Sequence, residues 1–323
     1  MSLGSMLEIK IFAKNKITKG VRTDLADSSK TAWGSVTNPK PADWDELNAI
    51  TKLDSKDVKE FLQANTRPRL SDLHEYAAIL FRSPSLSGKT IVTKPNLFLV
   101  SEQKRQIFTI TRGGLPAEEV INAQNGTRLE TFFAEGPTTL LYHLLEEIID
   151  AYRKVLEHVG EEVEKIEVAV LQKSSNSNVT SQIFRLRKTL VYIVRALFAN
   201  QEVVSAIEKS HSRYLNEKIE PRFRTLYEDI EQMEDLASIY RELLASSLDV
   251  HLSEVSNSLN IVMKRLTSLA AIVLVPTLIA GIYGMNFVWL PFAGSKGGFF
   301  VIGGIMLVSV IILYVYFKKR DWL

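Results

Sequence analysis

The stretch that decides the fold is MKRLTSLAAIVLVPTLIAGIYGMNF, residues 263–287. It holds no charged residue over 266–285, and a second uncharged run follows over 298–317. Each run is about 20 residues long, and as a helix it spans roughly the 30 Å core of a bilayer. The sequence therefore predicts two membrane helices near its C-terminal end, joined by an external connection over 286–297.

Basic residues flank the two predicted spans on one side. Lys264 and Arg265 precede the first span, and the tail over 318–323 holds three basic residues. The connection between the spans carries only Lys296. Because loops on the cytoplasmic side are enriched in Lys and Arg, we expect both termini in the cytoplasm. The expected location is the plasma membrane, with membrane lipid as a partner.

Composition excludes several other classes of protein. The 323 residues carry a net charge of +2, which gives no electrostatic case for binding nucleic acid. Cysteine is absent, so disulfides and thiolate metal sites are excluded. The five histidines are scattered and no nucleophile–base pair stands out, so we expect no enzyme. No glycine-rich nucleotide motif follows a predicted strand, and we expect no organic cofactor.

Residues 6–136 read as a cytoplasmic α/β domain. Short β-rich runs between turn residues predict strands over 7–13, 76–81, 96–101 and 106–112. Amphipathic runs, two of them starting at Pro or Asp, predict helices over 41–50, 54–63 and 115–124.

Long helices follow over 137–220 and beyond. We predict one helix over 138–172, a polar turn over 173–179, and a second helix over 180–216 that returns antiparallel. A further helix begins at Pro221.

No breaker interrupts this last helix before Pro276, so its stalk part over 221–265 continues into the first span and ends near Tyr283. A coiled-coil period, with steps of four and three, is followed by Leu226, Ile230, Met233, Ala237, Tyr240, Leu244 and Ser247.

The same step continues through the predicted membrane span as a stripe of mostly small or polar residues. From Asp249 it runs through Ser253, Ser256, Asn260, Met263, Thr267, Ala270, Leu274, Thr277, Gly281 and Gly284. Small and hydroxyl side chains allow membrane helices to pack closely. Alternatively, several copies of the helix surround a water-filled pore that this stripe lines. Two spans cannot enclose a pore, so the second interpretation requires a homo-oligomer.

Tyr283-Gly284-Met285-Asn286 places Gly-Met-Asn at the end of the first span. In this the sequence resembles the CorA family of magnesium channels, whose signature is Gly-Met-Asn at this position. The resemblance extends to the second span, the basic tail, and the order of α/β domain, helix pair and stalk.

The resemblance implies a homopentamer with a funnel-shaped cytoplasmic domain and a central pore lined by the first span. Gly284, Met285 and Asn286 would form the outer mouth, where Asn286 binds the ion through its hydration shell. Met263 and Leu266 would form a hydrophobic constriction, and Asp249 an acidic ring. The other pore-lining candidates are Asn260, Thr267, Ala270, Leu274, Thr277 and Gly281.

The family's regulatory acid pair is not recognisable in this sequence. The matching stalk position is Thr225, and the stretch RSPSLSG after the strand over 76–81 holds no acid. Four acidic residues are substitutes for it, and the sequence does not rank them: Asp72, Glu228, Asp229 and Asp235. Gating by intracellular Mg²⁺ is therefore a hypothesis.

Passive conduction of Mg²⁺, and of Co²⁺ or Ni²⁺ with it, is the main functional hypothesis. A zinc transporter of the same superfamily is the first alternative, although the intact Met285 favours magnesium. A non-conducting membrane-anchored sensor or scaffold is the second. It explains the stalk but not the polar stripe through the membrane.

Overall fold

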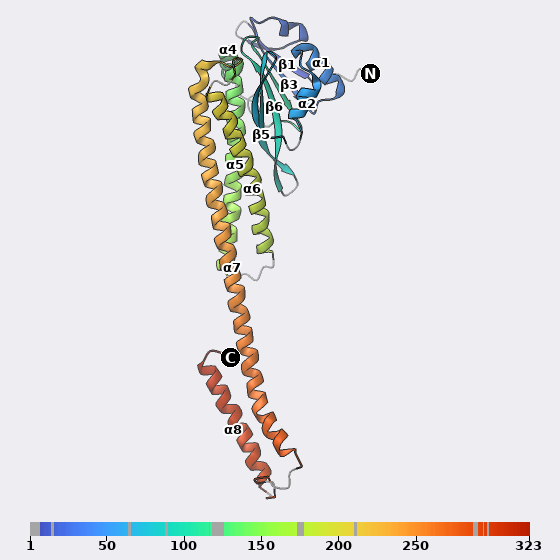
Figure 1. Ribbon diagram of the computed structural model, residues 1–323. Coiled ribbons are helices and arrows are strands. Elements are labelled where there is room, and N and C mark those ends of the chain that lie inside the picture. The colour runs from blue at the N-terminus through green and yellow to red at the C-terminus, as the bar shows by residue number, and fades with distance from the viewer. Residues whose placement is uncertain are drawn as a thin grey trace. The chain divides into compact units, whose positions relative to one another are not determined.

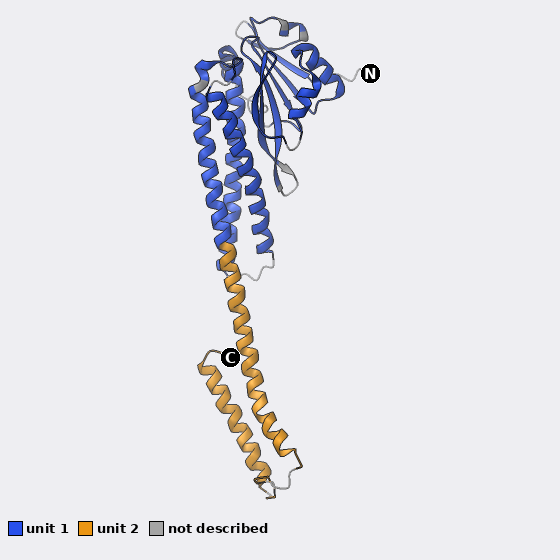
Figure 2. Ribbon diagram, in the orientation of Figure 1, with its two compact units in different colours: residues 1–246 blue, residues 247–323 orange. Residues whose placement is uncertain are grey.

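The structure is a computed structural model that forms two compact units, residues 1–246 and 247–323 (Figure 2). We call them the first unit and the second unit. The residues that it describes are 7–13, 16–63, 66–87, 90–115, 117, 126–172, 178–209, 212–286, 290–292, 294–295 and 297–323.

The first unit is built on a seven-stranded sheet with the order β2-β1-β3-β7-β6-β5-β4 (Figure 1). Only β3 and β7 pair in parallel among these neighbours, and the other pairs are antiparallel. The strands are β1 (Leu7–Ala13), β2 (Lys16–Lys19), β3 (Thr31–Thr37), β4 (Arg69–Leu73), β5 (Tyr76–Ser87), β6 (Thr90–Ser101) and β7 (Gln106–Thr111).

Helices cover the sheet on both faces, so its central strands are buried on both sides (Figure 1). The short elements are the 3₁₀ helix η1 (Arg22–Ala26) and the helices α1 (Pro41–Thr51), α2 (Ser55–Phe61) and α4 (Gly126–Glu135). Trp44 and Leu47 of α1 and Phe61 of α2 join one buried cluster with Leu80 and Leu97 of the sheet. Close packing is visible at Gly34, where an added Cβ would lie 2.6 Å from the Phe108 ring.

The long helices α5 (Pro137–Leu171) and α6 (Val179–Glu208) run side by side and pack on β5 and β6 (Figure 1). The first confirms the predicted helix over 138–172. The second corrects the prediction of a helix over 180–216, because residues 212–216 are not helical. There the Ser212 hydroxyl donates to Asp72 at 2.6 Å, and the Glu102 amide donates to the Tyr214 carbonyl at 2.9 Å. These contacts with the sheet hold the chain out of the helix.

The helix α7 (Glu220–Tyr283) has 64 residues and confirms the predicted continuous helix. After the 3₁₀ turn η2 (Glu217–Ile219), it buries its coiled-coil stripe within the first unit: Leu226, Ile230, Met233, Ala237 and Leu244 are all buried. A Cβ added to Gly160 of α5 would meet the Tyr240 hydroxyl at 2.4 Å, so α5 and α7 approach closely.

The sequence predicted only some of the strands of the sheet. The strand predicted over 7–13 is confirmed, and those over 76–81 and 96–101 are parts of longer strands. The strands β2, β3 and β4 and the helix α4 were not predicted. Apart from Leu115 and Ala117, the helix predicted over 115–124 lies outside the described residues.

Candidate functional site

Three helices among the described residues are long and apolar enough to cross a membrane: α6, α7 and α8 (Gly298–Lys319). In α6, half of the apolar window is buried inside the protein, against 6% in each of the other two. The buried Asn200 of α6 also accepts from the Arg82 amide at 2.9 Å and donates to the Arg82 carbonyl at 2.8 Å. These bonds tie α6 to the sheet and leave α7 and α8 as the spans.

In the second unit, α8 covers one face of α7. Ser268 is fully buried, and its hydroxyl lies 2.8 Å from the Arg265 carbonyl and 3.4 Å from the Trp322 carbonyl. Near the other end of the span, the Tyr283 hydroxyl donates to the Pro291 carbonyl at 3.1 Å. The half-buried residues of α7 in this span recur at helical spacing: Ala271, Ile272, Val275, Pro276, Ile279 and Tyr283.

The residues expected to line a pore lie on the other side of α7. At about 100° per residue, six of them cluster on the face opposite Ser268 and Ile279: Met263, Leu266, Ala270, Leu274, Thr277 and Gly281. Asn260 and Thr267 lie at the edge of this face. All of these candidates are exposed in the single chain: Asn260, Met263, Leu266, Thr267, Ala270, Leu274, Thr277 and Gly281. This exposed face is uncharged from Leu266 onward. A helix in a membrane has to cover such a face with lipid, with other helices or with water.

Thr277 and Pro276 change the hydrogen bonding of the α7 backbone, Thr277 on the exposed face and Pro276 on the half-buried side. The Thr277 hydroxyl donates to the Val273 carbonyl at 2.7 Å. Pro276 has no amide hydrogen and cannot donate to the carbonyl of Ile272, one turn before it. The Ile272 carbonyl lies with Pro276 on the half-buried side of α7, so on the exposed face the hydroxyl of Thr277 is the polar group near this turn.

The exposed face leads to Gly284, Met285 and Asn286. The Gly284 amide donates to the Ala280 carbonyl at 2.9 Å and the Met285 amide to the Ile282 carbonyl at 3.3 Å. A Cβ at Gly284 would lie 3.2 Å from the Ala280 carbonyl oxygen, which favours glycine there. Asn286 follows the last turn of the helix and is exposed. Its carboxamide is the first strongly polar side chain beyond the uncharged span.

Acidic candidates are dispersed over the two units. Asp249 is exposed on α7 in the second unit, and Asp235 is exposed on α7 in the first. Asp72 accepts from Ser212 at 2.6 Å, and Glu228 accepts from Arg224 at 2.9 Å. Asp229 lies 3.8 Å from Arg153, and partial burial raises the pKa of its carboxyl.

Within the described ranges of one chain, no group of three or more His, Cys, Asp or Glu side chains is arranged to hold a metal ion. The regulatory candidates Asp72, Glu228, Asp229 and Asp235 are thus not brought into a metal site inside the chain. A site that uses them has to be completed by other molecules or by other subunits.

The sequence reading missed the residues that fix α7 against α8. Ser268 and Trp322 meet at one end of the pair, and the Trp322 ring stacks on Phe317 at 5.6 Å. On α8, the half-buried or buried residues facing inward are Ile302, Met306, Ser309, Val310, Leu313 and Phe317. Both helices are mostly apolar on all sides, so the face that is covered in each does not differ in hydrophobicity from the faces that are exposed. The polar Ser268 was the only residue in the sequence that could have indicated the covered face of α7.

Comparisons with known proteins agree with this architecture. Residues 28–319 match the family described as CorA-like Mg²⁺ transporter protein. The chain is 28% identical over 292 residues to the cobalt/magnesium transport protein CorA of Methanocaldococcus jannaschii, covering 90% of this chain and 91% of the relative. It is also 28% identical over 308 residues to that of Thermotoga maritima, covering 92% and 85%.

The solved complete structure of the CorA magnesium transporter from Methanocaldococcus jannaschii superposes with a TM-score of 0.85 at 25% identity. The match covers 99% of this chain and 100% of that structure, including the soluble region, the long helix and the two apolar C-terminal helices. This is a membrane protein of a family of transporters, not of enzymes. The chain belongs to the CorA-like Mg²⁺ transporter family.

Proposed function

We propose that the protein is a passive Mg²⁺ channel whose pore is lined by the exposed face of α7 and opens at Asn286. The observation that carries the proposal is that this uncharged face lies opposite the face covered by α8 and leads to the Gly284-Met285-Asn286 turn. A face needed only for packing within the chain would be covered by α8.

The proposal requires a homo-oligomer, because one copy of α7 and α8 cannot enclose a pore. Met263, Leu266 and Leu274 each expose more than half of their side chain in the single chain. In an assembly around a central axis, these side chains approach those of the other copies. A pentamer is the arrangement that the family resemblance implies.

The chemistry at the mouth suits an ion that keeps its water. Mg²⁺ dehydrates reluctantly and usually retains several water molecules. A ring of Asn286 carboxamides can accept hydrogen bonds from those waters without trapping the ion, as a ring of carboxylates would. Conduction needs binding that is favourable but weak. Co²⁺ and Ni²⁺ are hydrated divalent ions that the same ring can receive.

The membrane potential supplies the driving force in this proposal. With both termini in the cytoplasm, as the basic flanks favour, the Asn286 end faces outward and Mg²⁺ flows in. An inside-negative potential is worth about 4.6 kcal/mol per 100 mV for a divalent ion, twice the single-charge value. The apolar side chains of Met263 and Leu266 can close the path by dewetting. Asp249 adds negative charge on the cytoplasmic side of Met263 and Leu266, where it concentrates cations.

Mg²⁺ uptake into proteoliposomes that hold the purified protein tests the function. We expect uptake that rises when a potassium diffusion potential makes the lumen negative and that is absent from protein-free liposomes. Uptake of Zn²⁺ with little uptake of Mg²⁺ would favour the zinc transporter. The absence of any divalent flux from folded, oligomeric protein would favour the non-conducting scaffold and overturn the proposal.

A further inference from the structure

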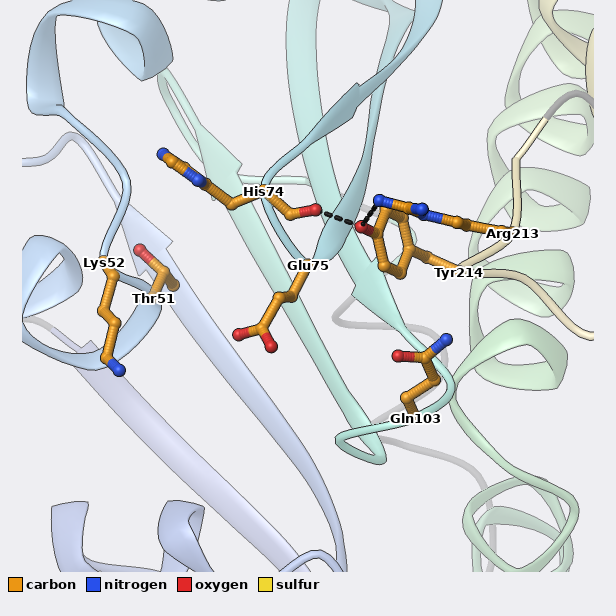
Figure 3. Close-up of a pocket in the computed structure, with 7 residues that line it drawn as sticks. All are labelled: Thr51, Lys52, His74, Glu75, Gln103, Arg213 and Tyr214. Carbon is orange, nitrogen blue, oxygen red and sulfur yellow. Dashed lines mark hydrogen bonds between the residues drawn. The ribbon is translucent and has the colours of Figure 1, made fainter.

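A polar pocket lies in the first unit, far along the chain from the residues proposed to conduct ions. It has a volume of about 660 Å³, within the range of roughly 300–1,000 Å³ that is usual for small-molecule sites. Four separate segments line it (Figure 3): the end of α1, the β4–β5 turn, the β6–β7 turn and the connector between α6 and α7. The lining residues are Thr51, Lys52, His74, Glu75, Gln103, Arg213 and Tyr214.

Positive charge exceeds negative charge in this pocket. Glu75 is the single carboxylate in the lining, and its side chain extends toward the side of the pocket where Lys52 lies, while Arg213 lies on the other side beside Tyr214 (Figure 3). Lys104 approaches the Glu75 carboxylate to 2.6 Å and holds the pKa of the Glu75 carboxyl below its usual range. Because Lys104 forms the ion pair with Glu75, and Lys52 acts on the same carboxylate only through its charge, the two cations of the lining, Lys52 and Arg213, outnumber its one acid.

The donors of the pocket are not used by the protein itself. Within the described part of the chain, the side chains of Lys52, His74 and Gln103 have no hydrogen-bond or salt-bridge partner. The Arg213 guanidinium donates to the Tyr214 hydroxyl at 2.7 Å and lies 5.0 Å from the ring centroid. This contact holds one edge of the guanidinium and leaves its other N–H groups for a ligand.

The backbone places two of these donors at some cost. Lys52 has φ 62° and His74 has φ 51°, in the left-handed region that favours glycine or asparagine. Local structure accounts for both positions, since Lys52 is the left-handed C-cap of α1 and His74 lies in the two-residue turn between β4 and β5. The α1 cap and the β4–β5 turn each bring a side chain with nitrogen donors into the same pocket.

The pocket also touches the connector over 212–219 that leads into α7. The Tyr214 hydroxyl donates to the His74 carbonyl, and the Ser212 hydroxyl donates to Asp72 at 2.6 Å. The Asn216 amide donates to the Thr138 hydroxyl at 3.1 Å. A ligand that binds Lys52, His74 and Arg213 together therefore links the sheet to the connector.

We propose that this pocket binds a small soluble anion with two or more phosphate groups, and that binding orders the connector over 212–219. Phosphate oxygens match the chemistry of the site, since Arg presents a fork of donors and Lys a point charge to them. A single phosphate would match the charge of two cations, but a second phosphate group lets one ligand reach both Lys52 and Arg213, which come from separate segments of the lining (Figure 3). The proposal stands apart from ion conduction, because it concerns binding alone.

Isothermal titration of the full-length protein in detergent with pyrophosphate, in magnesium-free buffer, tests the proposal. We expect saturable binding, weaker binding of inorganic phosphate, and a loss of about tenfold in affinity for Lys52→Gln or Arg213→Gln. Lys19→Gln removes the same charge from an exposed position on β2 and serves as the matched control. Hydrogen exchange is expected to slow at the backbone amides over 212–219 when pyrophosphate is bound.

Two results would overturn the proposal. One is the absence of saturable pyrophosphate binding, and the other is binding that Lys19→Gln weakens as much as Lys52→Gln. The Lys52 side chain has no bonding partner in the described residues, so its substitution does not threaten folding even if Arg213→Gln does. If pyrophosphate binds but hydrogen exchange at the backbone amides over 212–219 does not change, the proposal that binding orders the connector would be contradicted.

Discussion

The two ends of α7 have similar periodicity but opposite environments. In the first unit, its stripe of apolar residues is buried: Leu244 is 0% exposed. In the second unit, the equivalent step places Leu274 at 66% exposed. The first unit thus gains stability from burial within one chain, whereas the second leaves most of its apolar surface exposed in the single chain. The heptad step alone therefore does not distinguish a helix face that is buried in a soluble core from one that is exposed in the membrane segment.

Substituting the same residue type at each end gives the largest expected difference. Leu244→Ala should lower the free energy of unfolding by about 2–5 kcal/mol, because it opens a cavity in a packed core. Leu274→Ala should change the stability in detergent by less than about 1 kcal/mol, because the side chain is exposed in the single chain and lines the proposed pore instead of a packed core. Thermal unfolding of the two full-length variants measures both effects. Equal destabilisation would mean that Leu274 is packed as tightly as Leu244.

Removing the acid at the start of the second unit should alter conduction moderately. Asp249→Ala is expected to lower Mg²⁺ uptake by about two- to fivefold at low ionic strength, with a smaller effect at high salt, because screening weakens its field. Asp45→Ala on α1 removes the same charge from an exposed position and should leave uptake unchanged. A complete loss of conduction in Asp249→Ala would show that its carboxylate is essential to the ion path.

A smaller effect is expected at Glu234, in the first unit. One of its carboxylate oxygens is buried and has no hydrogen-bond partner among the residues that the structure describes. Burial raises the pKa of this carboxyl, and the charges of Asp235 and Glu231 raise it further. A carboxyl with a raised folded-state pKa destabilises the fold at pH values above its unfolded pKa. That penalty is relieved as the pH falls through the folded pKa.

Glu234→Gln should therefore raise the melting temperature by about 1–2 °C at neutral pH, after allowance for the partial exposure of the group. The gain should vanish near about pH 4, where the wild-type carboxyl is protonated. Glu242→Gln, at an exposed position on the same helix, should produce no such pH-dependent gain. A gain at Glu234 that persists at acid pH would point to packing instead of charge.

The long helices of this protein were predictable from sequence, apart from the end of α6, whereas α4 and parts of the sheet were not. Uncharged runs and the heptad step predicted α7 and α8 because they depend on local pattern. The hairpin of β5 and β6 extends past Pro84 and Pro95, which normally mark strand ends. Both prolines lie where each strand has one partner only, since β4 pairs with β5 as far as Leu80 and β7 with β6 from Asn96. A missing amide hydrogen is tolerated there.

Non-local contacts explain the other errors. No glycine or proline follows α6 to indicate where the helix ends. The connector after it is held by hydrogen bonds to Asp72, His74 and Glu102. The strand β3 pairs in parallel with β7, about 70 residues away in sequence, which no local pattern indicates. The polar pocket lies on segments from four parts of the chain, so its cations could not be grouped from the sequence. The pore-lining candidates, in contrast, lie on one helix, where spacing was enough to group them.

Mg²⁺ uptake by proteoliposomes carrying Asn286→Ala tests the central claim most directly. Asn257→Ala is the matched control, because it removes the same carboxamide from an exposed position on α7 before the uncharged span. We expect Asn286→Ala to lose most or all of the potential-driven uptake while keeping the oligomeric state and melting temperature of the wild type. Asn257→Ala should conduct like the wild type. Equal uptake by the wild type and Asn286→Ala would contradict the assignment of Asn286 to the pore mouth.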